Sequence, residues 1–280
     1  MKAPNYSIIT CVSDFDVYNS CLLSSLEQFE NNDLYEVIPI DNRNKAYTAS
    51  AAINLGLKIA HSDIIICCHQ DVTLLPRFFD ILSNHIKNLK RNKKWKLIGC
   101  AGRRYDPNRT DFSEGDVGIV FNGPPGYKGQ DFELALERPW NGMTDLTEVH
   151  CVDECLFIIN NSHDDKLVFD TNLKGFHFYG VDYSIQARQA GYKVYAAYLP
   201  IIHHGAYSSS LIVNQDYWYL YKDLISKWIK VEDRCFGTHM HWRKRADGIK
   251  EISSYIVANA DTHRFRAKIL YSTINEKLDD

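Results

Sequence analysis

A continuous apolar run at residues 64–68, Ile-Ile-Ile-Cys-Cys, ends abruptly at the polar residues 69–71, His-Gln-Asp. An uninterrupted apolar run of this length predicts a strand that is covered on both faces, as in parallel sheets flanked by helices. Ligands of such sheets bind at the carboxyl ends of the strands. The run therefore favours an α/β fold, and the polar turn after it marks the expected site.

The segments around this run alternate between strand and helix patterns. Short β-rich or apolar runs predict strands, and apolar residues at helical spacing predict the helices between them. The predicted strands cover residues 6–12, 36–40, 64–68, 97–101, 152–159 and 193–202, and the predicted helices cover residues 19–29, 47–60, 77–89 and 182–189. This order predicts an α/β fold with a mostly parallel central sheet and helices on both of its faces.

The pattern changes after residue 102. Residues 103–150 are rich in glycine and proline, which predicts a set of active-site loops rather than long regular elements. Residues 206–280 have a helical pattern in which aromatic residues alternate with basic ones. That pattern fits ordinary helix packing with a homodimer contact, and it also fits a surface that meets lipid headgroups. We expect one domain over residues 1–205, divided near residue 102, and a helical C-terminal extension over residues 206–280.

Composition limits the compartment and the partners. With 280 residues, 45% of them hydrophobic, the chain can bury a sizeable core. A formal net charge of −3 gives no electrostatic argument for a nucleic-acid partner. The N-terminus lacks the pattern of a secretory signal, and no apolar run reaches the roughly 20 residues that span a bilayer. The eight cysteines lie mostly in apolar runs, which is typical of reduced, buried thiols, so we expect a cytoplasmic protein.

Three predicted strands end in side chains that can bind a metal ion. Asp41 follows the second strand, Asp71 follows the third, and His203 and His204 end the last one. Carboxylate and imidazole ligands favour Mn²⁺ or Mg²⁺, and histidine favours Mn²⁺ of the two. A cation held there could act as a Lewis acid and neutralise bound phosphate groups.

An ordered set of short motifs resembles the family 2-like glycosyltransferases of the GT-A fold. The set comprises Asp-Asn at 41–42, Asn-Lys-Ala at 44–46, Ile-Cys-Cys-His-Gln-Asp-Val at 66–72, Phe-His-Phe-Tyr-Gly-Val-Asp-Tyr at 176–183, Ala-Gly-Tyr-Lys-Val at 190–194 and Pro-Ile-Ile-His-His-Gly at 200–205. Each motif is weak alone, and their order along residues 6–210 carries the resemblance. The resemblance implies a nucleotide-sugar half at residues 1–102 and an acceptor and catalytic half at residues 103–205.

The resemblance also implies a nucleotide and metal site. Residues 69–71 occupy the position of the family's Asp-x-Asp motif, so that Asp71 matches the metal-binding aspartate and His69 replaces the first aspartate. His204, with His203 as the second choice, matches the metal ligand from the late strand. The residues that the resemblance assigns to the nucleotide are Thr10, Val12, Asp14, Asp41, Asn44, His69, Gln70 and Asp71.

For the catalytic half, Asp182 falls where inverting members carry the base that takes a proton from the acceptor hydroxyl. Contacts with the donor sugar or the acceptor are expected at Trp140, Asp153, Glu154 and Tyr179. Each assignment has a competing interpretation. Asp182 and Asp71 are also typical helix caps. The two adjacent histidines, 203 and 204, also fit one core position and one surface position. Asp153 and Glu154 fit plain loop charges, and Trp140 fits local packing.

We therefore expect a metal-dependent enzyme that moves a sugar from a nucleotide sugar, UDP-linked, to a hydroxyl of a surface glycan or a lipid-linked glycan, with inversion. Its cofactor is Mn²⁺ or Mg²⁺. The alternatives are a retaining transferase on the same fold and a non-catalytic nucleotide-sugar-binding protein. Peripheral contact with the inner face of the membrane remains open for the C-terminal extension.

Overall fold

A central sheet of seven strands runs through the computed structural model in the order β2-β1-β3-β11-β5-β12-β9. The structure describes residues 4–29, 34–89, 94–104, 116–118, 121–122, 146–163, 167–205, 220, 223–224 and 227–228. The strands of the central sheet are β1 (Tyr6–Val12), β2 (Tyr35–Asp41), β3 (Ile64–Cys68), β5 (Trp95–Gly99), β9 (Thr147–Glu148), β11 (Leu156–Asn160) and β12 (Lys193–Ala196).

Most strands of this sheet point the same way. β1 pairs in parallel with both β2 and β3, and β12 pairs in parallel with β5. β11 is antiparallel to β3 and β5, and β9 is antiparallel to β12. The predicted mostly parallel α/β sheet is therefore confirmed.

Two smaller sheets lie beside the central one. One contains β10 (Cys151–Val152), β6 (Ala101–Arg103) and β7 (Asp116–Gly118), and the other contains β4 (Val72–Leu74), β13 (Ile201–His203) and β8 (Phe121–Asn122). The second sheet matters for function because β4 starts directly after the polar turn. Its pairing with β13 brings the end of the last strand to that turn.

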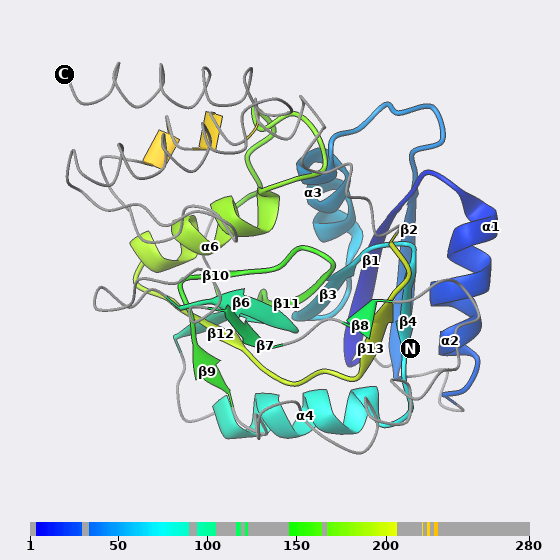
Figure 1. Ribbon diagram of the computed structural model, residues 1–280, viewed down its shortest axis with the longest axis horizontal. Helices are drawn as coiled ribbons and strands as arrows, with labels where there is room; N and C mark the ends of the chain where they lie inside the picture. Colours follow the sequence, from blue (N-terminus) through cyan, green and yellow to red (C-terminus); the bar gives the residue numbers. More distant parts are fainter. Residues whose placement is uncertain are drawn as a thin grey trace, which may run out of the picture.

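Helices cover both faces of the central sheet (Figure 1). On one face lie α1 (Phe15–Tyr18), a π-helical turn (Asn19–Leu23), α2 (Ser24–Leu26) and α4 (Phe78–Leu89), and on the other lie α3 (Ala49–Ile59) and α6 (Tyr179–Gln189). Neighbouring residues of one strand point to opposite faces. Ile8 therefore packs in the core on the side of α1, α2 and α4, and Ile9 packs in the core on the side of α3 and α6. Continuous apolar runs are required because both faces are buried.

Several element boundaries differ from the predicted ones. The strands predicted at residues 97–101 and 152–159 each divide between two sheets, as β5 and β6 and as β10 and β11. The helix predicted at residues 19–29 begins at Phe15, because the Asp14 side chain caps it, and it ends at Leu26. The strand predicted at residues 193–202 divides into β12 and β13, which belong to different sheets. α6 begins at Tyr179 rather than after Asp182, so Asp182 lies in the first turn of the helix and does not cap it.

None of the seven cysteines within the described residues forms a disulfide, and all but Cys11 are buried, as predicted for reduced thiols. Among the described helices, none combines the length and the apolar character needed to cross a bilayer. The predicted boundary at residue 205 stays a prediction, since most of residues 206–280 lie outside the described part of the chain.

Candidate active site

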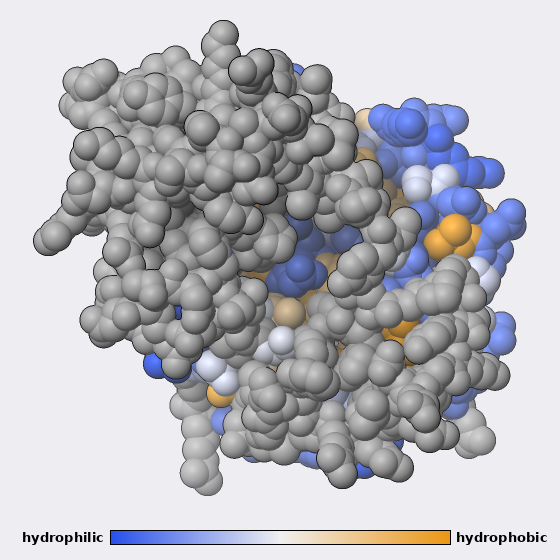
Figure 2. All heavy atoms as spheres, in the orientation of Figure 1, coloured by the Kyte–Doolittle hydropathy of each residue, from blue (hydrophilic) through white to orange (hydrophobic). Residues whose placement is uncertain are grey.

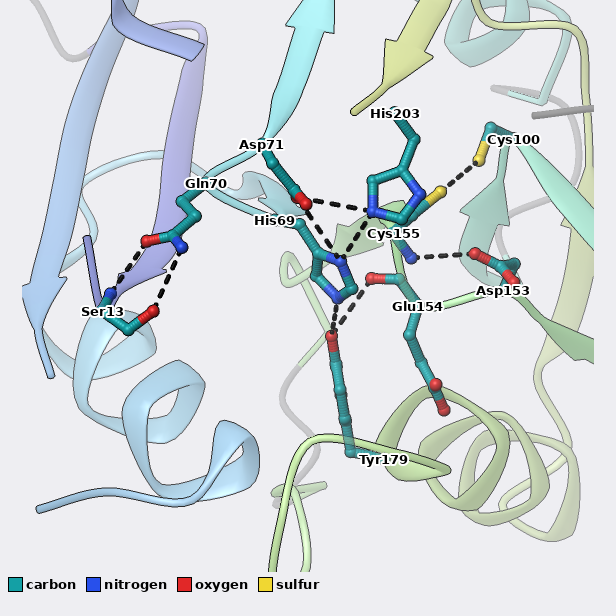
Figure 3. A network of polar contacts seen from close by, with 10 residues as sticks. All are labelled: Ser13, His69, Gln70, Asp71, Cys100, Asp153, Glu154, Cys155, Tyr179 and His203. Atoms are coloured by element: carbon teal, nitrogen blue, oxygen red, sulfur yellow. Dashed lines mark hydrogen bonds and ion pairs between the residues drawn. The ribbon is translucent and has the colours of Figure 1, made fainter. Parts of the chain in front are cut away.

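Three potential metal ligands converge at the polar turn after β3. The antiparallel pairing of β4 and β13 puts His203 opposite Val72, and this brings His203 Nε2 to 3.4 Å from Asp71 Oδ1. His69 Nδ1 lies 3.3 Å from His203 Nε2 and 3.9 Å from Asp71 Oδ1. We refer to His69, Asp71 and His203 as the ligand cluster (Figure 3).

The geometry of the ligand cluster fits a divalent transition metal. Bonds of about 2.1 Å at a tetrahedral angle place two ligand atoms about 3.4 Å apart. Two of the three distances, 3.3 and 3.4 Å, match this spacing, and the third, 3.9 Å, needs a small side-chain movement. Two imidazole nitrogens and one carboxylate oxygen suit Mn²⁺ and other transition metals better than Mg²⁺, which prefers oxygen.

The side chain that lies next to the Asp71 carboxylate is that of His203 and not that of the predicted His204, whose backbone N–H donates to the Asp71 carbonyl oxygen at 2.8 Å. Successive side chains of a strand point to opposite sides, so only one of two adjacent histidines can face the turn. The side chain of His204 points elsewhere, and its Nε2 lies 2.8 Å from Thr73 Oγ1. The geometry favours His203, the second choice from the resemblance, as the late-strand ligand, while metal binding itself stays a prediction.

Tyr179 orients the imidazole of His69. The Tyr179 hydroxyl donates to the carbonyl oxygen of Glu154 at 3.1 Å and lies 2.9 Å from His69 Nε2. Because its one proton is used on Glu154, the hydroxyl accepts from His69 Nε2–H, and the lone pair stays on Nδ1, inside the ligand cluster. Burial and the nearby His203 lower the pKa of His69 to about 4. His69 is therefore neutral at neutral pH, which is the form that binds metal.

Asp71 carries the negative charge of the ligand cluster. Burial raises the pKa of its carboxyl group, but the hydrogen bond and the charge of His203 outweigh burial and lower the pKa below its usual value. The carboxylate form that a metal requires is thus favoured by the residues around it.

A cleft next to the ligand cluster follows the carboxyl ends of β1 and β3. Its walls include Cys11 and Ser13 at the end of β1, Ile53 of α3, and Phe176. Tyr179 and all three residues of the polar turn also face it. Figure 2 shows a hollow near the centre of this face of the molecule with hydrophilic side chains at its floor.

The side chains of Thr10 and Val12 do not line this cleft. Both are buried, and Val12 packs in the core on the other face of the sheet, because alternate residues of β1 point in opposite directions. Ile9 and Cys11 of β1 line the cleft instead. The two-residue periodicity of a strand, counted back from Ser13, predicts these two positions, and motif matching alone does not use this signal.

Gln70 ties the polar turn to the end of β1. Its Oε1 accepts hydrogen bonds from the backbone N–H groups of Ser13 at 2.8 Å and Asp14 at 3.0 Å, and its Nε2 donates to Ser13 Oγ at 3.1 Å. The amide therefore fixes the two loops that flank the cleft. This gives Gln70 a structural role beside the predicted nucleotide contact.

The remaining residues predicted to bind nucleotide are not among those that line the cleft. Asp14 Oδ1 accepts from the N–H groups of Asp16 and Val17 and caps α1. Asp41 is exposed and pairs with Arg43, whose hydrogen bonds lower its pKa to about 2. Asn44 is exposed in the turn that follows.

Asp153 and Glu154 lie on the opposite side of the ligand cluster from Ser13 and Gln70 (Figure 3). Asp153 Oδ1 accepts from the backbone N–H of Cys155 at 2.9 Å. Glu154 Oε1 accepts from the N–H of Gly180 at 3.2 Å, at the start of α6. Burial and the charge of Asp153 raise the pKa of Glu154 well above its usual value.

Asp182 is buried, and both oxygens of its carboxylate contact other side chains. Its Oδ2 accepts from Gln186 Nε2 at 2.7 Å, and its Oδ1 accepts from Trp228 Nε1 at 2.6 Å and pairs with Lys227 Nζ at 2.7 Å. The side chain is 1% exposed. The predicted contact at Trp140 lies outside the described residues.

The fold is that of the GT-A glycosyltransferases. The chain resembles the crystal structure of GalNAc-T7 with UDP, GalNAc and Mn²⁺ at a TM-score of 0.51 and 9% identity, over 81% of this chain and 49% of that one. It therefore spans about half the length of GalNAc-T7. A second similar structure is TarS 1-349 of S. aureus, with a TM-score of 0.46 and 12% identity over 90% of this chain and 70% of that one.

The family model described as "Glycosyltransferase like family" matches residues 7–221, and the chain belongs to this family. It is thus an enzyme of the glycosyltransferase class. A curated protein of Fuscovulum blasticum named "ATP synthase subunits region ORF 6" is 28% identical over 205 residues, which cover 71% of this chain and 75% of that protein.

Proposed function

We propose that this enzyme transfers a sugar from a nucleoside diphosphate sugar, UDP-linked, to a hydroxyl of a surface or lipid-linked glycan, with inversion and with a transition-metal ion. The observation that carries this proposal is the ligand cluster at the rim of the cleft. UDP binding is reported in the name of the GalNAc-T7 structure, and supports the proposal by analogy of fold.

His69, Asp71 and His203 are the residues that would hold the ion. Mn²⁺ bound there would act as a Lewis acid on the diphosphate. The protein itself orients the site: Tyr179 keeps the His69 lone pair directed into the ligand cluster, and Gln70 holds the polar turn against the end of β1. We expect a donor whose nucleoside lies along β1 to place its sugar on the side of the cluster where Asp153 and Glu154 lie.

The test is a panel of nucleotide sugars and divalent metals, scored by thermal shift and by release of the nucleoside diphosphate. We expect Mn²⁺ and UDP to raise the melting temperature together, and Asp71→Asn to abolish this joint effect. If no nucleotide sugar stabilises the protein with any metal, the proposal is wrong.

The anomeric configuration of the product decides between inversion and retention. Retention would contradict the inverting part of the proposal and remove the need for a general base. A protein that binds UDP and metal but never releases product would be a non-catalytic nucleotide-sugar-binding protein. The acceptor and the cytoplasmic or peripheral location stay predictions.

A further inference from the structure

The cleft beside the ligand cluster changes from apolar to polar along its length. Ile9 and Cys67, which are paired residues of β1 and β3, lie at its apolar end. Further along the same face of β1 come Cys11 and then Ser13, which is hydrogen-bonded to Gln70 of the polar turn. A ligand with an apolar ring and a charged group therefore fits the cleft with its charge towards the ligand cluster.

The start of α3 encloses the apolar end of the cleft. Ala49, the first residue of this helix, and Ile53, about one turn further on, line the cleft, and both are buried. The cleft has a volume of about 180 Å³, many times the roughly 10–15 Å³ that one water molecule needs. It therefore has room for a planar ring.

Phe176 adds an aromatic side chain to this end of the cleft. The residue lines the cleft, and 44% of its surface is exposed. Its backbone is held on both sides: the carbonyl oxygen of Gly175 accepts from the N–H of Ala49 at 3.0 Å, and the Tyr179 hydroxyl lies 2.9 Å from His69 Nε2. An exposed aromatic ring on a fixed segment is preorganised to stack on a flat ligand.

The side chains at the apolar end do not suit a diphosphate. No lysine or arginine is among the described residues that line the cleft. Phosphate groups at the apolar end would lose their hydration without gaining a counter-charge, which is costly. We therefore expect the diphosphate at the ligand cluster, where a bound metal ion would supply the positive charge.

A sugar ring also fits the apolar end poorly. Its hydroxyl groups point outwards all around the ring, so several of them would be buried against apolar side chains without a hydrogen-bond partner. A nucleobase differs because its polar groups lie in the plane of the ring and leave two faces for stacking. Such a base can bind with its faces against apolar side chains and its polar edge towards the open side of the cleft.

We propose that Phe176 is the stacking platform for the nucleobase of the donor, at the apolar end of the cleft. This inference rests on the proposed function and names the residue that binds the base. The ring of Phe176 contacts the base, and the ligand cluster holds the diphosphate. Substitution of Phe176 should therefore weaken only those ligands that carry a base.

The test compares UDP with inorganic pyrophosphate, which carries two phosphates but no base. Each ligand is titrated calorimetrically into wild type and Phe176→Ala in the presence of Mn²⁺. Loss of one base–aromatic stack should weaken UDP binding by about 5- to 150-fold. The affinity for pyrophosphate should change by less than about twofold, because the substitution lies outside the ligand cluster.

Three further variants separate stacking from other effects. Phe176→Tyr keeps the aromatic face and should bind UDP as wild type does. Phe176→Leu keeps only an apolar side chain and should bind UDP about 2- to 13-fold more weakly than Phe176→Tyr. Ile59→Ala is the matched control, since Ile59 is 51% exposed at the other end of α3 and is not among the residues that line the cleft. We expect it to leave both affinities unchanged.

Equal losses of UDP and pyrophosphate affinity in Phe176→Ala would overturn the inference, because the ring would then support the ligand cluster and not the base. Unchanged UDP affinity would overturn it as well, and a raised KM for the nucleotide sugar in the same variant would then assign the ring to the sugar. A wild-type protein that binds neither UDP nor pyrophosphate with Mn²⁺ would instead refute the proposed function.

Discussion

Replacing His203, the last residue of β13, and its neighbour His204 by alanine one at a time should show which of the two binds the metal ion. His203 Nε2 lies within 3.4 Å of both other members of the ligand cluster, whereas His204 Nε2 lies 2.8 Å from Thr73 Oγ1. His203→Ala therefore removes one of three direct ligands. His204→Ala removes a side chain that contacts Thr73 and is not part of the cluster.

The expected sizes differ by more than an order of magnitude. Loss of a residue that only orients a metal ligand typically costs about 10–100-fold in affinity, so loss of the ligand itself should cost at least about 100-fold. This corresponds to about 2.7 kcal/mol in binding free energy. For His204→Ala we expect a change of less than about threefold, because the ligand cluster stays complete.

Isothermal titration of the metal-free proteins with Mn²⁺ measures these affinities directly. Melting temperatures without metal serve as the control, since a loss of affinity that follows general unfolding says nothing about ligands. If His204→Ala weakens Mn²⁺ binding as much as His203→Ala, or more, the argument from strand alternation is wrong and the motif-based assignment is right.

Three further substitutions test the surroundings of the site. Tyr179→Phe removes the hydroxyl that orients one imidazole of the ligand cluster, so Mn²⁺ affinity should fall by about 10–100-fold in the same titration, and an unchanged affinity would exclude this role. Gly175→Ala places a Cβ 2.7 Å from Leu220 Cδ1 at a backbone φ of +126°, so we expect chemical denaturation to show a loss of about 1–3 kcal/mol, and equal stability would contradict the packing. Burial raises the pKa of the Asp170 carboxyl group, but the hydrogen bond with Lys227 outweighs burial and lowers that pKa below its usual value. The pair therefore stabilises the folded state above the unfolded-state pKa near 4, and this contribution is lost as the pH falls through the lower folded-state pKa. Asp170→Asn should therefore be less stable than wild type at pH 7, with the difference closing below about pH 4, and a gap that does not depend on pH would contradict the ion pair.

Local patterns were sufficient to predict the sheet and the turn that carries the candidate site. The apolar run at residues 64–68 forms β3, and the polar turn after it carries Asp71 into the ligand cluster. These features depend on neighbours in sequence: an apolar strand needs cover on both faces, and the residues that follow it emerge at its carboxyl end. The turn was therefore found without knowledge of any distant contact.

The direction of individual side chains was harder to predict, because it depends on register. The resemblance ranked His204 before His203, and it placed Thr10 and Val12 in the nucleotide site. In the structure the register of β13 on β4 selects His203, and the alternation of β1 selects Ile9 and Cys11. A shift of one residue turns a side chain to the other face, so a motif that is aligned to within one residue does not decide between neighbours.

The surroundings of Asp182 depend on contacts that are remote in sequence. A motif identifies Asp182 by its place at the start of α6, but whether its carboxylate is available depends on Lys227 and Trp228, which lie about 45 residues further along the chain. No local pattern links these residues to α6. Matching a sequence to a family therefore locates a carboxylate, whereas its hydrogen-bond partners decide whether it can take a proton.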